Sequence, residues 1–507
     1  MTDFDYMQLQ NGSDIRGIAL SGVAGEEPNL TPERSAGIAG AFLRWLAKKT
    51  GKETADLKVA LGRDSRLSGE DIAAAAFRGF APYGAAILDC GLASTPAMFM
   101  STVFPETGCD GAVMLTASHL PWNRNGFKFF DRDGGLQKAD ITAILQLAAE
   151  AENDAPAAAA ARVTRFDLMS LYCAHLRDLI RRGVSRNGEE KEKPLSGLKI
   201  AVDAGNGSGG FFASQVLDPL GADISASQFL EPDGHFPNHI PNPENKEAMD
   251  SISARVTGCG CDLGLIFDTD VDRSSAVDSS GNEISRNNIV ALAALLVSED
   301  HPGTTVVTDS ITSDHLKDFL ENNLGMHHFR YKRGYKNVIN KALELNSEGT
   351  ECWLAIETSG HAAMRENYFL DDGAYLAARI VIKAAGLARE GKRIDDLLKD
   401  LKQPAESREV RMKITCPEHS EFGDALLADF AAWADSRDFD IAEPNYEGVR
   451  ISFGKGEGSG WCLLRKSLHD PLMPLNIESD VSGGVAKISA TLRDFLDRYN
   501  DLDTSEL

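Results

Sequence analysis

The chain of 507 residues has little cysteine, and its cysteines show no pattern typical of a structural site. Eight of them are spread over positions 90 to 462, which indicates reduced thiols packed as small hydrophobic residues rather than a disulfide framework. Cys259 and Cys261 form the one close pair, and a single C-x-C without a second pair is a poor signal for zinc.

Long apolar segments are missing as well. No uninterrupted apolar run reaches the ~18 residues that a membrane helix needs, so we expect no membrane span. The N-terminal segment MTDFDYMQLQNGSD is acidic and has neither the basic region nor the apolar core of a secretory signal. We therefore expect a cytoplasmic protein without a membrane partner.

Positive charge is the third shortage. The chain has 52 Lys and Arg against 76 Asp and Glu, a formal net charge of -24. Such a charge argues against nucleic acid or an anionic membrane as the main partner. Any site for an anionic substrate must be a local concentration of Arg, Lys and backbone N–H groups.

What the sequence does contain indicates an α/β protein of several domains. Its length predicts three or four domains, and short apolar strands alternate with longer amphipathic helices. A buried strand that runs into an Asp-containing turn recurs at Lys58–Asp64, Lys199–Asp203 and Thr304–Asp309. We expect three similar α/β domains with mixed sheets, at 1–160, 161–298 and 299–405, and a smaller α+β domain at 406–507.

Two helix starts are marked in the first of these regions. Thr31 precedes Pro32, and the apolar-rich run that follows ends at Gly51, which predicts an N-cap, a first helical residue and a C-terminal cap. Ser68 and Asp71 have the spacing of a capping box at the start of a second helix.

A first candidate for chemistry follows the apolar strand predicted at Gly111–Leu115. The segment Thr116-Ala117-Ser118-His119-Leu120-Pro121 places one hydroxyl in a turn of small residues, with Lys128 a few positions later. Ser118 could attack or carry a phosphoryl group, while His119 and Lys128 could move protons or steady negative charge. An ordinary turn that caps the strand explains the same residues, and this fragment alone leaves that alternative open.

A second candidate follows the apolar run Leu263–Phe267. Asp268, Asp270 and Asp272 alternate along a short loop and could direct three carboxylates at one point, which suits a hard cation. Three converging carboxylates would repel one another strongly without a cation. The loop lacks the Gly and the bidentate Glu of an EF-hand, and a solvated acidic turn remains an alternative.

Two further segments carry groups suited to sugars and phosphates. Glu357-Thr358-Ser359-Gly360-His361 follows the strand-like run Trp353–Ile356 and offers carboxylate, hydroxyl and imidazole groups. Arg465-Lys466-Ser467 could hold a phosphate through the fork of Arg and the hydroxyl of Ser. A turn cap and a solvated basic turn explain these two fragments equally well.

In this order, the four segments resemble the loops of the α-D-phosphohexomutase superfamily, which contains phosphomannomutases and phosphoglucomutases. They look like its phosphoserine, magnesium, sugar-recognition and phosphate-binding loops. Smaller matches to the same family lie at Asp14–Gly17, Gly62–Arg66, Thr95-Pro96, Asp203–Gly207, Pro232–Asn238 and Lys332–Lys336. The resemblance covers nearly the whole chain and implies four domains around a central active-site cleft.

The resemblance also implies roles for individual residues. Catalytic residues would be Ser118 as the phosphoserine, Lys128 as general acid/base, and His119 and Arg16. Mg²⁺ would be held by Ser118, Asp268, Asp270 and Asp272. Substrate would be bound by Arg273, Gly334, Tyr335, Glu357, Ser359, His361, Arg465, Lys466 and Ser467. The implied reaction interconverts hexose 1-phosphate and hexose 6-phosphate of glucose or mannose, with a hexose 1,6-bisphosphate as intermediate and activator, in a monomer or homodimer.

The chain departs from the family pattern mainly in the phosphate-binding loop. Leu468 and His469 replace residues that would supply a hydroxyl and an amide donor, and Pro474 replaces an Arg often found there. Tyr335 stands where some of these enzymes have His. Glucosamine phosphate is therefore a rival substrate. The altered loop would also suit synthesis or hydrolysis of a hexose bisphosphate, or binding of sugar phosphate without catalysis. The retained Ser118 and Lys128 count against binding without catalysis.

Overall fold

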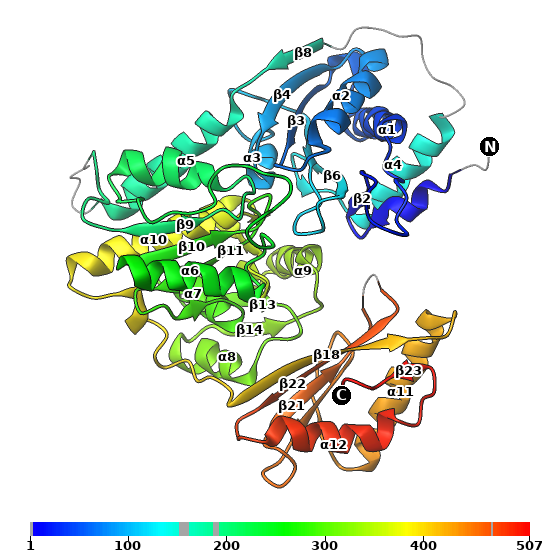
Figure 1. Ribbon diagram of the computed structural model, residues 1–507, viewed down its shortest axis with the longest axis vertical. Coiled ribbons are helices and arrows are strands. Elements are labelled where there is room, and N and C mark those ends of the chain that lie inside the picture. The colour runs from blue at the N-terminus through cyan, green and yellow to red at the C-terminus, as the bar shows by residue number, and fades with distance from the viewer. Residues whose placement is uncertain (1–3, 152–161, 186–191, 468–469) are drawn as a thin grey trace. The chain divides into compact units, whose positions relative to one another are not determined.

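The computed structural model describes residues 4–151, 162–185, 192–467 and 470–507 (Figure 1). The chain divides into two compact units, one of Met1–Leu296 with Ser359–Leu398 and one of Val297–Thr358 with Lys399–Leu507. Its sheets and helices form three α/β domains and a fourth, sheet-rich C-terminal domain, which confirms the predicted fold class. The predicted boundary at 160/161 lies outside the described residues.

The first unit begins with an eight-stranded mixed sheet in the order β1-β2-β6-β5-β3-β4-β8, with β7 paired to β6. Its strands are β1 (Gln10–Asn11), β2 (Asp14–Ile18), β3 (Lys58–Arg63), β4 (Ala86–Leu92), β5 (Gly111–Leu115), β6 (Arg124–Asp131), β7 (Gly134–Gly135) and β8 (Arg162–Arg165). The helices are α1 (Pro32–Thr50), α2 (Gly69–Phe80), α3 (Thr95–Met100) and α4 (Lys138–Ala151). Strand β3 runs parallel to both of its neighbours, β4 and β5, and β6 returns antiparallel to β5. The predicted strand at Lys58–Asp64 is thus an interior strand of this sheet.

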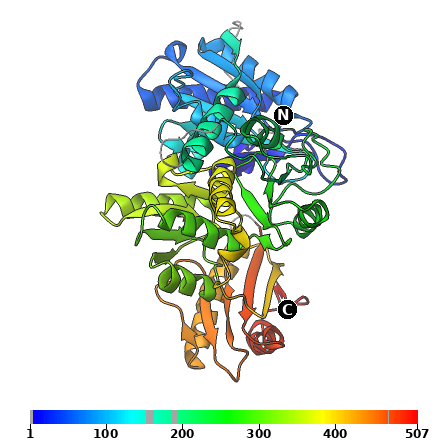
Figure 2. The same ribbon diagram turned by 90° about the vertical axis from the view of Figure 1, so that its left-hand side faces the viewer.

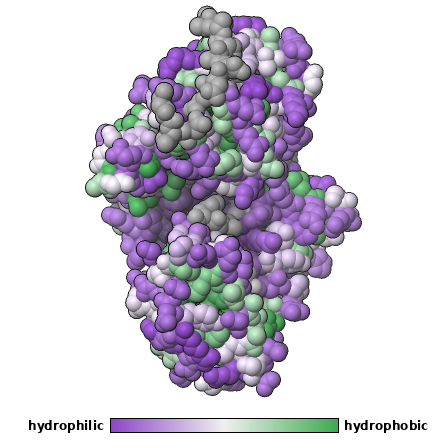
Figure 3. Space-filling view, turned by 90° about the vertical axis from the view of Figure 1, so that its right-hand side faces the viewer, coloured by the Kyte–Doolittle hydropathy of each residue, from purple (hydrophilic) through white to green (hydrophobic). Residues whose placement is uncertain are grey.

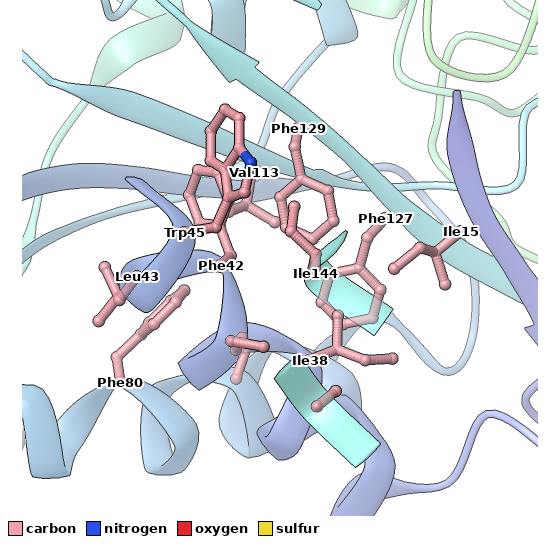
Figure 4. Close-up of a cluster of buried hydrophobic side chains, with 14 of the residues drawn as sticks. Ile15, Ile38, Phe42, Leu43, Trp45, Phe80, Val113, Phe127, Phe129 and Ile144 are labelled. Carbon is pink, nitrogen blue, oxygen red and sulfur yellow. The ribbon is translucent and has the colours of Figure 1, made fainter. Parts of the chain in front are cut away.

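The core of this sheet is aromatic on one face (Figure 4). The rings of Phe42 on α1 and Phe129 on β6 stack with centroids 4.6 Å apart, and Phe127 stacks on Phe129. Each is almost fully buried, and burial of one such side chain is worth roughly 1.5–3 kcal/mol. The strand β6, which carries Lys128 between these two Phe residues, is therefore held firmly by its apolar face.

One predicted helix start is confirmed and the other is wrong in its detail. Thr31 accepts a hydrogen bond from the N–H of Arg34, Pro32 is the first residue of α1, and Gly51 ends the helix in the left-handed region. Helix α2 begins after Ser68, but Ser68 makes no capping hydrogen bond there. Its hydroxyl instead accepts a hydrogen bond from the side-chain N–H of Asn125 on β6, 2.9 Å away. The tertiary partner displaces the local capping box.

A second sheet of the first unit has four strands in the order β12-β11-β10-β9. They are β9 (Ile200–Asp203), β10 (Leu263–Phe267), β11 (Ser274–Asp278) and β12 (Glu283–Ile284). The helices of this region are α5 (Leu168–Val184), α6 (Lys246–Cys259), α7 (Asn287–Ser298) and α10 (Gly373–Arg389), and a short antiparallel pair joins β16 (Ala362–Met364) to β17 (Leu370–Asp371). Strands β9 and β10 are parallel, β10 and β11 antiparallel, and all three are fully buried.

The second unit contains a parallel group of strands and the C-terminal sheet. Strand β13 (Thr305–Thr308) pairs in parallel with β14 (His327–Arg330) and β15 (Cys352–Ile356), accompanied by α8 (Asp314–Asp318) and α9 (Tyr335–Ser347). The C-terminal sheet has the order β19-β20-β21-β22-β18-β23. Its elements are β18 (Glu406–Ile414), α11 (His419–Ser436), β19 (Asp440–Ile441), β20 (Val449–Phe453), β21 (Gly460–Leu464), β22 (Leu472–Ser479), α12 (Gly484–Leu496) and β23 (Leu502–Asp503).

Helices α11 and α12 cover one face of that C-terminal sheet (Figure 2). Phe430 of α11 and Phe495 of α12 pack with Ile451 and Leu464 of the strands in one apolar cluster. Because side chains alternate along a strand, the residues between these apolar positions lie on the opposite face. That opposite face is polar and carries Arg450, Trp461, Glu478 and Arg465.

The surface in Figure 3 is mostly hydrophilic, with hydrophobic residues scattered between polar ones. In the part of the chain that the structure describes, we find no helix both long and apolar enough to cross a membrane. None of the eight described cysteines forms a disulfide, and six of them are buried.

Candidate active site

Ser118 lies in the loop that follows β5, as the sequence predicts, and its side chain is held by charged groups. Its Oγ accepts a hydrogen bond from Nη2 of Arg273 at 2.8 Å and donates one to Oδ2 of Asp268 at 3.2 Å. Its N–H donates to Oγ1 of Thr116 at 2.9 Å. The hydroxyl therefore has a fixed position and a cationic partner that could hold a phosphoryl group placed on it.

The backbone around Ser118 is strained and supported from below. Ser118 has φ 50°, a left-handed conformation that costs energy for a non-glycine residue. The buried guanidinium of Arg66 donates to four backbone carbonyls of this segment, those of Ser118, Leu120, Pro121 and Arg124. Asp64, at the end of β3, forms an ion pair with Arg66 at 3.3 Å. Burial raises the pKa of Asp64 to about 6, although the charge of Arg66 opposes the shift.

The three loop carboxylates converge after β10. Asp268, Asp270 and Asp272 are almost fully buried and each offers an oxygen within 4.8 Å of the others. Between them Val271 has φ 67°, which is exceptional for a β-branched residue and indicates a loop held in place by its surroundings. One such contact comes from the first residue of α10, because the N–H of Gly373 donates to the carbonyl of Val271 at 3.0 Å.

The donor set fits a divalent cation. Oδ1 of Asp270 and Oδ1 of Asp272 are buried and accept no hydrogen bond among the described residues, so lone pairs remain for a metal ion. Burial and the charge of Asp272 raise the pKa of Asp268 well above its usual value. Burial would also raise the pKa of Asp272, but Lys128 and His361 hold it well below the usual range. Hard carboxylate oxygens in this number suit Mg²⁺.

Lys128 and Arg16 approach the same region from the first sheet. The ammonium of Lys128 lies 3.3 Å from Oδ2 of Asp270 and forms a shorter ion pair with Asp272. Arg16, on the neighbouring strand β2, donates to the carbonyl of Thr116 at 2.6 Å. A side chain on Gly126 would collide with the carbonyl of Ile15 at 2.0 Å, so glycine there lets β2 lie close to β6.

Arg273 contacts both the serine loop and the carboxylates. Besides Ser118, its guanidinium contacts Oδ2 of Asp268 at 2.9 Å and donates to Nδ1 of His119 at 2.8 Å. Nδ1 must therefore be unprotonated, so His119 is neutral in this arrangement. Neighbouring carboxylates hold the pKa of Arg273 above its ordinary value, although burial acts in the opposite direction.

The last residues of the sugar-recognition motif reach the same centre. His361 pairs as an isolated bridge with Arg273, and its Nε2 lies 3.6 Å from Oδ1 of Asp272. Its other nitrogen, Nδ1, is 2.8 Å from Oγ of Ser359. The first unit thus brings together Ser118, His119, Lys128, Arg16, the three Asp residues, Arg273, Ser359 and His361.

Glu357 belongs to the second unit and has a partner there. Its Oε1 accepts a hydrogen bond from the N–H of Gly334 at 2.7 Å, and the residue is 4% exposed. Gly334 has φ 106°, where glycine is favoured, and it precedes Tyr335, the first residue of α9. The structure therefore unites three predicted substrate-binding residues, Gly334, Tyr335 and Glu357, at one end of α9.

The phosphate-loop residues diverge in direction. Arg465, just after β21, is 5% exposed on the polar face of the C-terminal sheet. Lys466 points to α11, where its ammonium contacts Oδ1 of Asp424 at 2.7 Å, as the alternation of an extended segment requires. Ser467 accepts a hydrogen bond from the N–H of Asp470. Leu468 and His469 lie outside the described residues.

Three family models match most of the chain. They are phosphoglucomutase/phosphomannomutase α/β/α domain I at residues 7–155, domain II at residues 172–281 and domain III at residues 285–404. The chain belongs to the phosphoglucomutase/phosphomannomutase family. It is therefore a member of the α-D-phosphohexomutase superfamily and an enzyme of the intramolecular phosphotransferase type, an isomerase.

Individual relatives agree with this family. A phosphomannomutase/phosphoglucomutase of Pseudomonas syringae pv. tomato is 30% identical over 450 residues, which cover 88% of each chain. A phosphoglucomutase of Neisseria gonorrhoeae is 31% identical over 436 residues, 85% of this chain and 86% of the relative. The crystal structure of a phosphoglucomutase/phosphomannomutase family protein from Burkholderia thailandensis is similar with a TM-score of 0.76 and 26% identity, covering 96% of each chain.

Some residues of this family member support the site although their local sequence assigns them no role. Arg66 holds the serine loop, and Thr95 donates through its hydroxyl to Oδ2 of Asp270 at 2.5 Å. Asn242 accepts a hydrogen bond from Nη1 of Arg273 at 3.2 Å. Arg66 and Thr95 both lie in segments that match the family, and that match is the signal that could have found them.

Proposed function

We propose that this enzyme interconverts hexose 1-phosphate and hexose 6-phosphate of glucose or mannose through a phosphoserine at position 118. The observation that carries the proposal is the position of the Ser118 hydroxyl. Its oxygen lies between the guanidinium of Arg273 and the carboxylate of Asp268, in a unit that also presents Lys128. A phosphorylated oxygen there would meet both a cation for its charge and, through Asp268, a metal site.

In the first half-reaction, phosphorylated Ser118 gives its phosphoryl group to a free hydroxyl of the sugar monophosphate. The P–O bond to Ser118 breaks, a P–O bond to the sugar forms, and a bisphosphorylated sugar results. Lys128 is the proposed base that takes the proton of the attacking hydroxyl, with Arg16 and His119 assisting. The intermediate then turns in the site and returns its other phosphate to Ser118, with the proton restored to the sugar oxygen that leaves.

The three Asp residues and an oxygen of phosphorylated Ser118 are the proposed ligands of Mg²⁺. When bound, the ion would neutralise negative charge as it develops on the transferring phosphoryl group. Arg273 places a fixed positive charge beside the side-chain oxygen of Ser118, and Asn242 orients the guanidinium of Arg273. A hexose 1,6-bisphosphate would serve as the activator that phosphorylates Ser118 when it carries no phosphate.

Substrate recognition is assigned to the residues that the resemblance to the family names. Glu357 and Ser359 are proposed to bind sugar hydroxyls, with Gly334, Tyr335 and His361 near them. Arg465, Lys466 and Ser467 are proposed to hold the phosphate that does not react, for which the ammonium of Lys466 would have to leave Asp424. The division into domains at 160/161, 298/299 and 405/406 is supported by family models that end at residues 155, 281 and 404. We also propose a cytoplasmic monomer or homodimer.

The names of the relatives favour glucose and mannose phosphates over glucosamine phosphate. The test offers the purified enzyme, with Mg²⁺ and a catalytic amount of hexose bisphosphate, the 1-phosphates of glucose, mannose and glucosamine. We expect 6-phosphate from glucose and mannose 1-phosphates. Release of inorganic phosphate would favour a hydrolase and accumulation of bisphosphate a synthase, whereas binding without any product would favour a non-catalytic protein.

The role of Ser118 is tested by mass. Part of the purified protein should carry one phosphate, and Ser118→Ala should lose both that mass and all turnover, a fall of at least ~10³-fold because the nucleophile is gone. Ser347→Ala, at an exposed serine at the end of α9, is the matched control and should keep both. A Ser118→Ala protein that remains phosphorylated and active would contradict the mechanism.

A further inference from the structure

In the second unit Arg465 lies near a second arginine and three carboxylates that have no role in the proposed function. Arg333 lies in the loop between β14 and α9, and Arg465 follows β21. We call these two residues the arginine pair. The carboxylates that surround them are Asp309 after β13, Glu409 on β18 and Glu447 just before β20.

Arg465 is buried but incompletely bonded. Its Nε–H donates to no described partner, although the residue is only 5% exposed. Burial and the nearby charge of Arg333 lower the pKa of Arg465, while Glu447, Glu409 and Asp309 act in the opposite direction. The backbone is fixed closely on one side, because a side chain on Gly448 would lie 2.8 Å from Cβ of Arg465. An arginine held in this way retains donor capacity for an anion.

Arg333 is fixed by the same carboxylates. Its N–H donates to Oε2 of Glu447 at 3.1 Å, and its Nε lies 3.7 Å from Oδ2 of Asp309. Glu447 also accepts a short hydrogen bond from the hydroxyl of Ser310. The carboxylate of Glu447 thereby ties three segments together: the turn after β13, the loop before α9 and the loop before β20.

The position of Arg333 in the chain connects the pair to sugar recognition. The next residue, Gly334, donates its N–H to Oε1 of Glu357 at 2.7 Å. A ligand whose hydroxyl groups reach Glu357 could therefore present a charged group to Arg333. Two neighbouring guanidiniums repel each other unless an anion lies between them, and a phosphate dianion can accept the forks of both.

The sequence of the phosphate loop gives an independent reason for a second arginine. Leu468 stands where Asn or Gly is usual in the family and offers no polar side-chain atom, and His469 stands where Thr is usual. Loss of these donors would weaken a phosphate subsite that relied on that loop alone. A guanidinium with five N–H donors on a different loop would restore the bonding.

We propose that Arg333 binds the same substrate phosphate as Arg465, and that Glu447 is the positioning residue that holds the loop of Arg333 in place. The inference rests on the proposed function for the identity of the ligand, the phosphate of a hexose phosphate that does not react. It adds a specificity-determining arginine outside the phosphate loop.

The main test compares Arg333→Gln with the wild-type enzyme. The loss of a charge-assisted hydrogen bond predicts an approximately tenfold rise in KM for glucose 1-phosphate and in the Kd of glucose 6-phosphate measured by calorimetry, with kcat changed less than about twofold. Arg333→Lys should give an intermediate Kd, since it keeps the charge but loses the fork. Lys317→Gln removes an exposed positive charge from α8 and should change neither constant.

Glu447→Gln separates positioning from simple electrostatics. Removal of a negative charge near the phosphate would by itself tighten binding. The hydrogen bonds from Arg333 and Ser310 would then be accepted by a neutral amide oxygen, and their weakening should loosen the loop of Arg333 and weaken binding. We expect a rise in Kd of about threefold to tenfold for glucose 6-phosphate, with restoration toward the wild-type value in Glu447→Asp. Glu443→Gln, at an exposed residue of the same loop, makes the same charge change and should leave Kd unaltered.

The outcomes distinguish this inference from the proposed function. If the wild-type enzyme binds glucose 6-phosphate but shows no mutase turnover, the proposed function fails while the binding comparison still decides the role of Arg333. Binding by folded Arg333→Gln and Arg333→Lys within twofold of wild type would overturn the assignment of Arg333. A lower Kd in Glu447→Gln would overturn the positioning role of Glu447.

Discussion

The centre around Ser118 in the first unit and the arginine pair in the second unit differ in how their charged side chains are held. Ser118, Lys128 and Arg273 are at most 9% exposed, and each contacts an oppositely charged or hydrogen-bonding side chain. Arg465 is as deeply buried but leaves Nε without a described partner, and the side chain of Arg333 is 20% exposed. Side-chain contacts fix the serine centre, whereas Arg465 of the arginine pair retains a donor for a ligand.

The serine centre and the loop of Arg333 also differ in backbone strain. In the serine centre, Ser118 and Val271 adopt left-handed conformations that favour glycine, with φ 50° and 67°. In the loop of Arg333, the residue with positive φ is Gly334, which has no such cost. Strain of this kind persists where the surroundings over-determine the backbone, which suits groups that must be held for chemistry. The comparison therefore predicts that changes in the first unit act mainly on kcat and changes in the second mainly on KM.

The largest expected effect comes from the carboxylate loop. Asp270→Asn should lower kcat by about 10³-fold with little change in KM, since it removes a charge from the proposed Mg²⁺ site that acts on the transferring group. Its neighbour Thr95 would keep a hydrogen-bond acceptor in the amide oxygen, so the loop should stay folded. Steady-state rates over a Mg²⁺ titration provide the measurement.

Asp56→Asn is the control, because Asp56 is an exposed residue of the same unit and same side-chain type. It should leave both the rate and the Mg²⁺ midpoint unchanged. Treatment of the wild-type enzyme with EDTA should abolish turnover, and addition of Mg²⁺ should restore it. Full activity after EDTA would contradict the proposed Mg²⁺ site of the first unit.

A smaller effect is expected at Glu357. Glu357→Gln keeps the size of the side chain but weakens the hydrogen bond to the N–H of Gly334 and the binding of sugar hydroxyls. We expect kcat/KM for glucose 1-phosphate to fall by about 10–100-fold, mostly through KM, because charged acceptors contribute about 1.5–3 kcal/mol. Glu348→Gln, an exposed residue at the end of α9, should have no effect. A fall confined to kcat would place Glu357 with the chemistry instead.

Much of the local fold could be predicted from the sequence. The strands at Gly111–Leu115 and Leu263–Phe267 match β5 and β10 residue for residue, and the predicted Thr31 cap of α1 is present. These features depend on short apolar runs and on cap residues within a few positions, which a single sequence displays directly. The capping box predicted at Ser68 failed because its hydroxyl binds Asn125, 57 residues away in the chain.

The residues that orient the site could not be predicted from local sequence patterns, for the same reason. Arg66 reaches carbonyls 52 to 58 residues later, and Thr95 contacts Asp270 at a separation of 175 residues. Nothing near Glu447 in the sequence indicates that it meets Arg333, 114 residues before it. The groups that carry chemistry are recognisable by their type and order, whereas the residues that orient them depend on which strands become neighbours.

The smallest effect concerns Glu478, on the sheet face that also carries Arg465. Its carboxylate accepts a hydrogen bond from the indole N–H of Trp461 at 3.0 Å, and Arg450, Asp314 and His315 are the charged groups nearby. Burial raises the pKa of Glu478 from 4.5 to about 7, although Arg450 opposes the shift. Because the folded-state pKa is raised, the protonated form is favoured by folding. Its contribution is fully present below pH ~4.5 and is lost as the pH rises through about 7.

The second unit should therefore lose up to about 3 kcal/mol of stability between pH 5 and pH 8.5, and Glu478→Gln should remove most of this dependence. Urea unfolding followed by tryptophan fluorescence measures it, since Trp461 reports on the bonded carboxylate. His315→Asn, which removes the nearby imidazole, should retain the transition. If Glu478→Gln leaves the pH dependence intact, the polar face is stabilised by its ion pairs alone. The difference between the two units in how they hold charged side chains would then depend on the arginine pair alone.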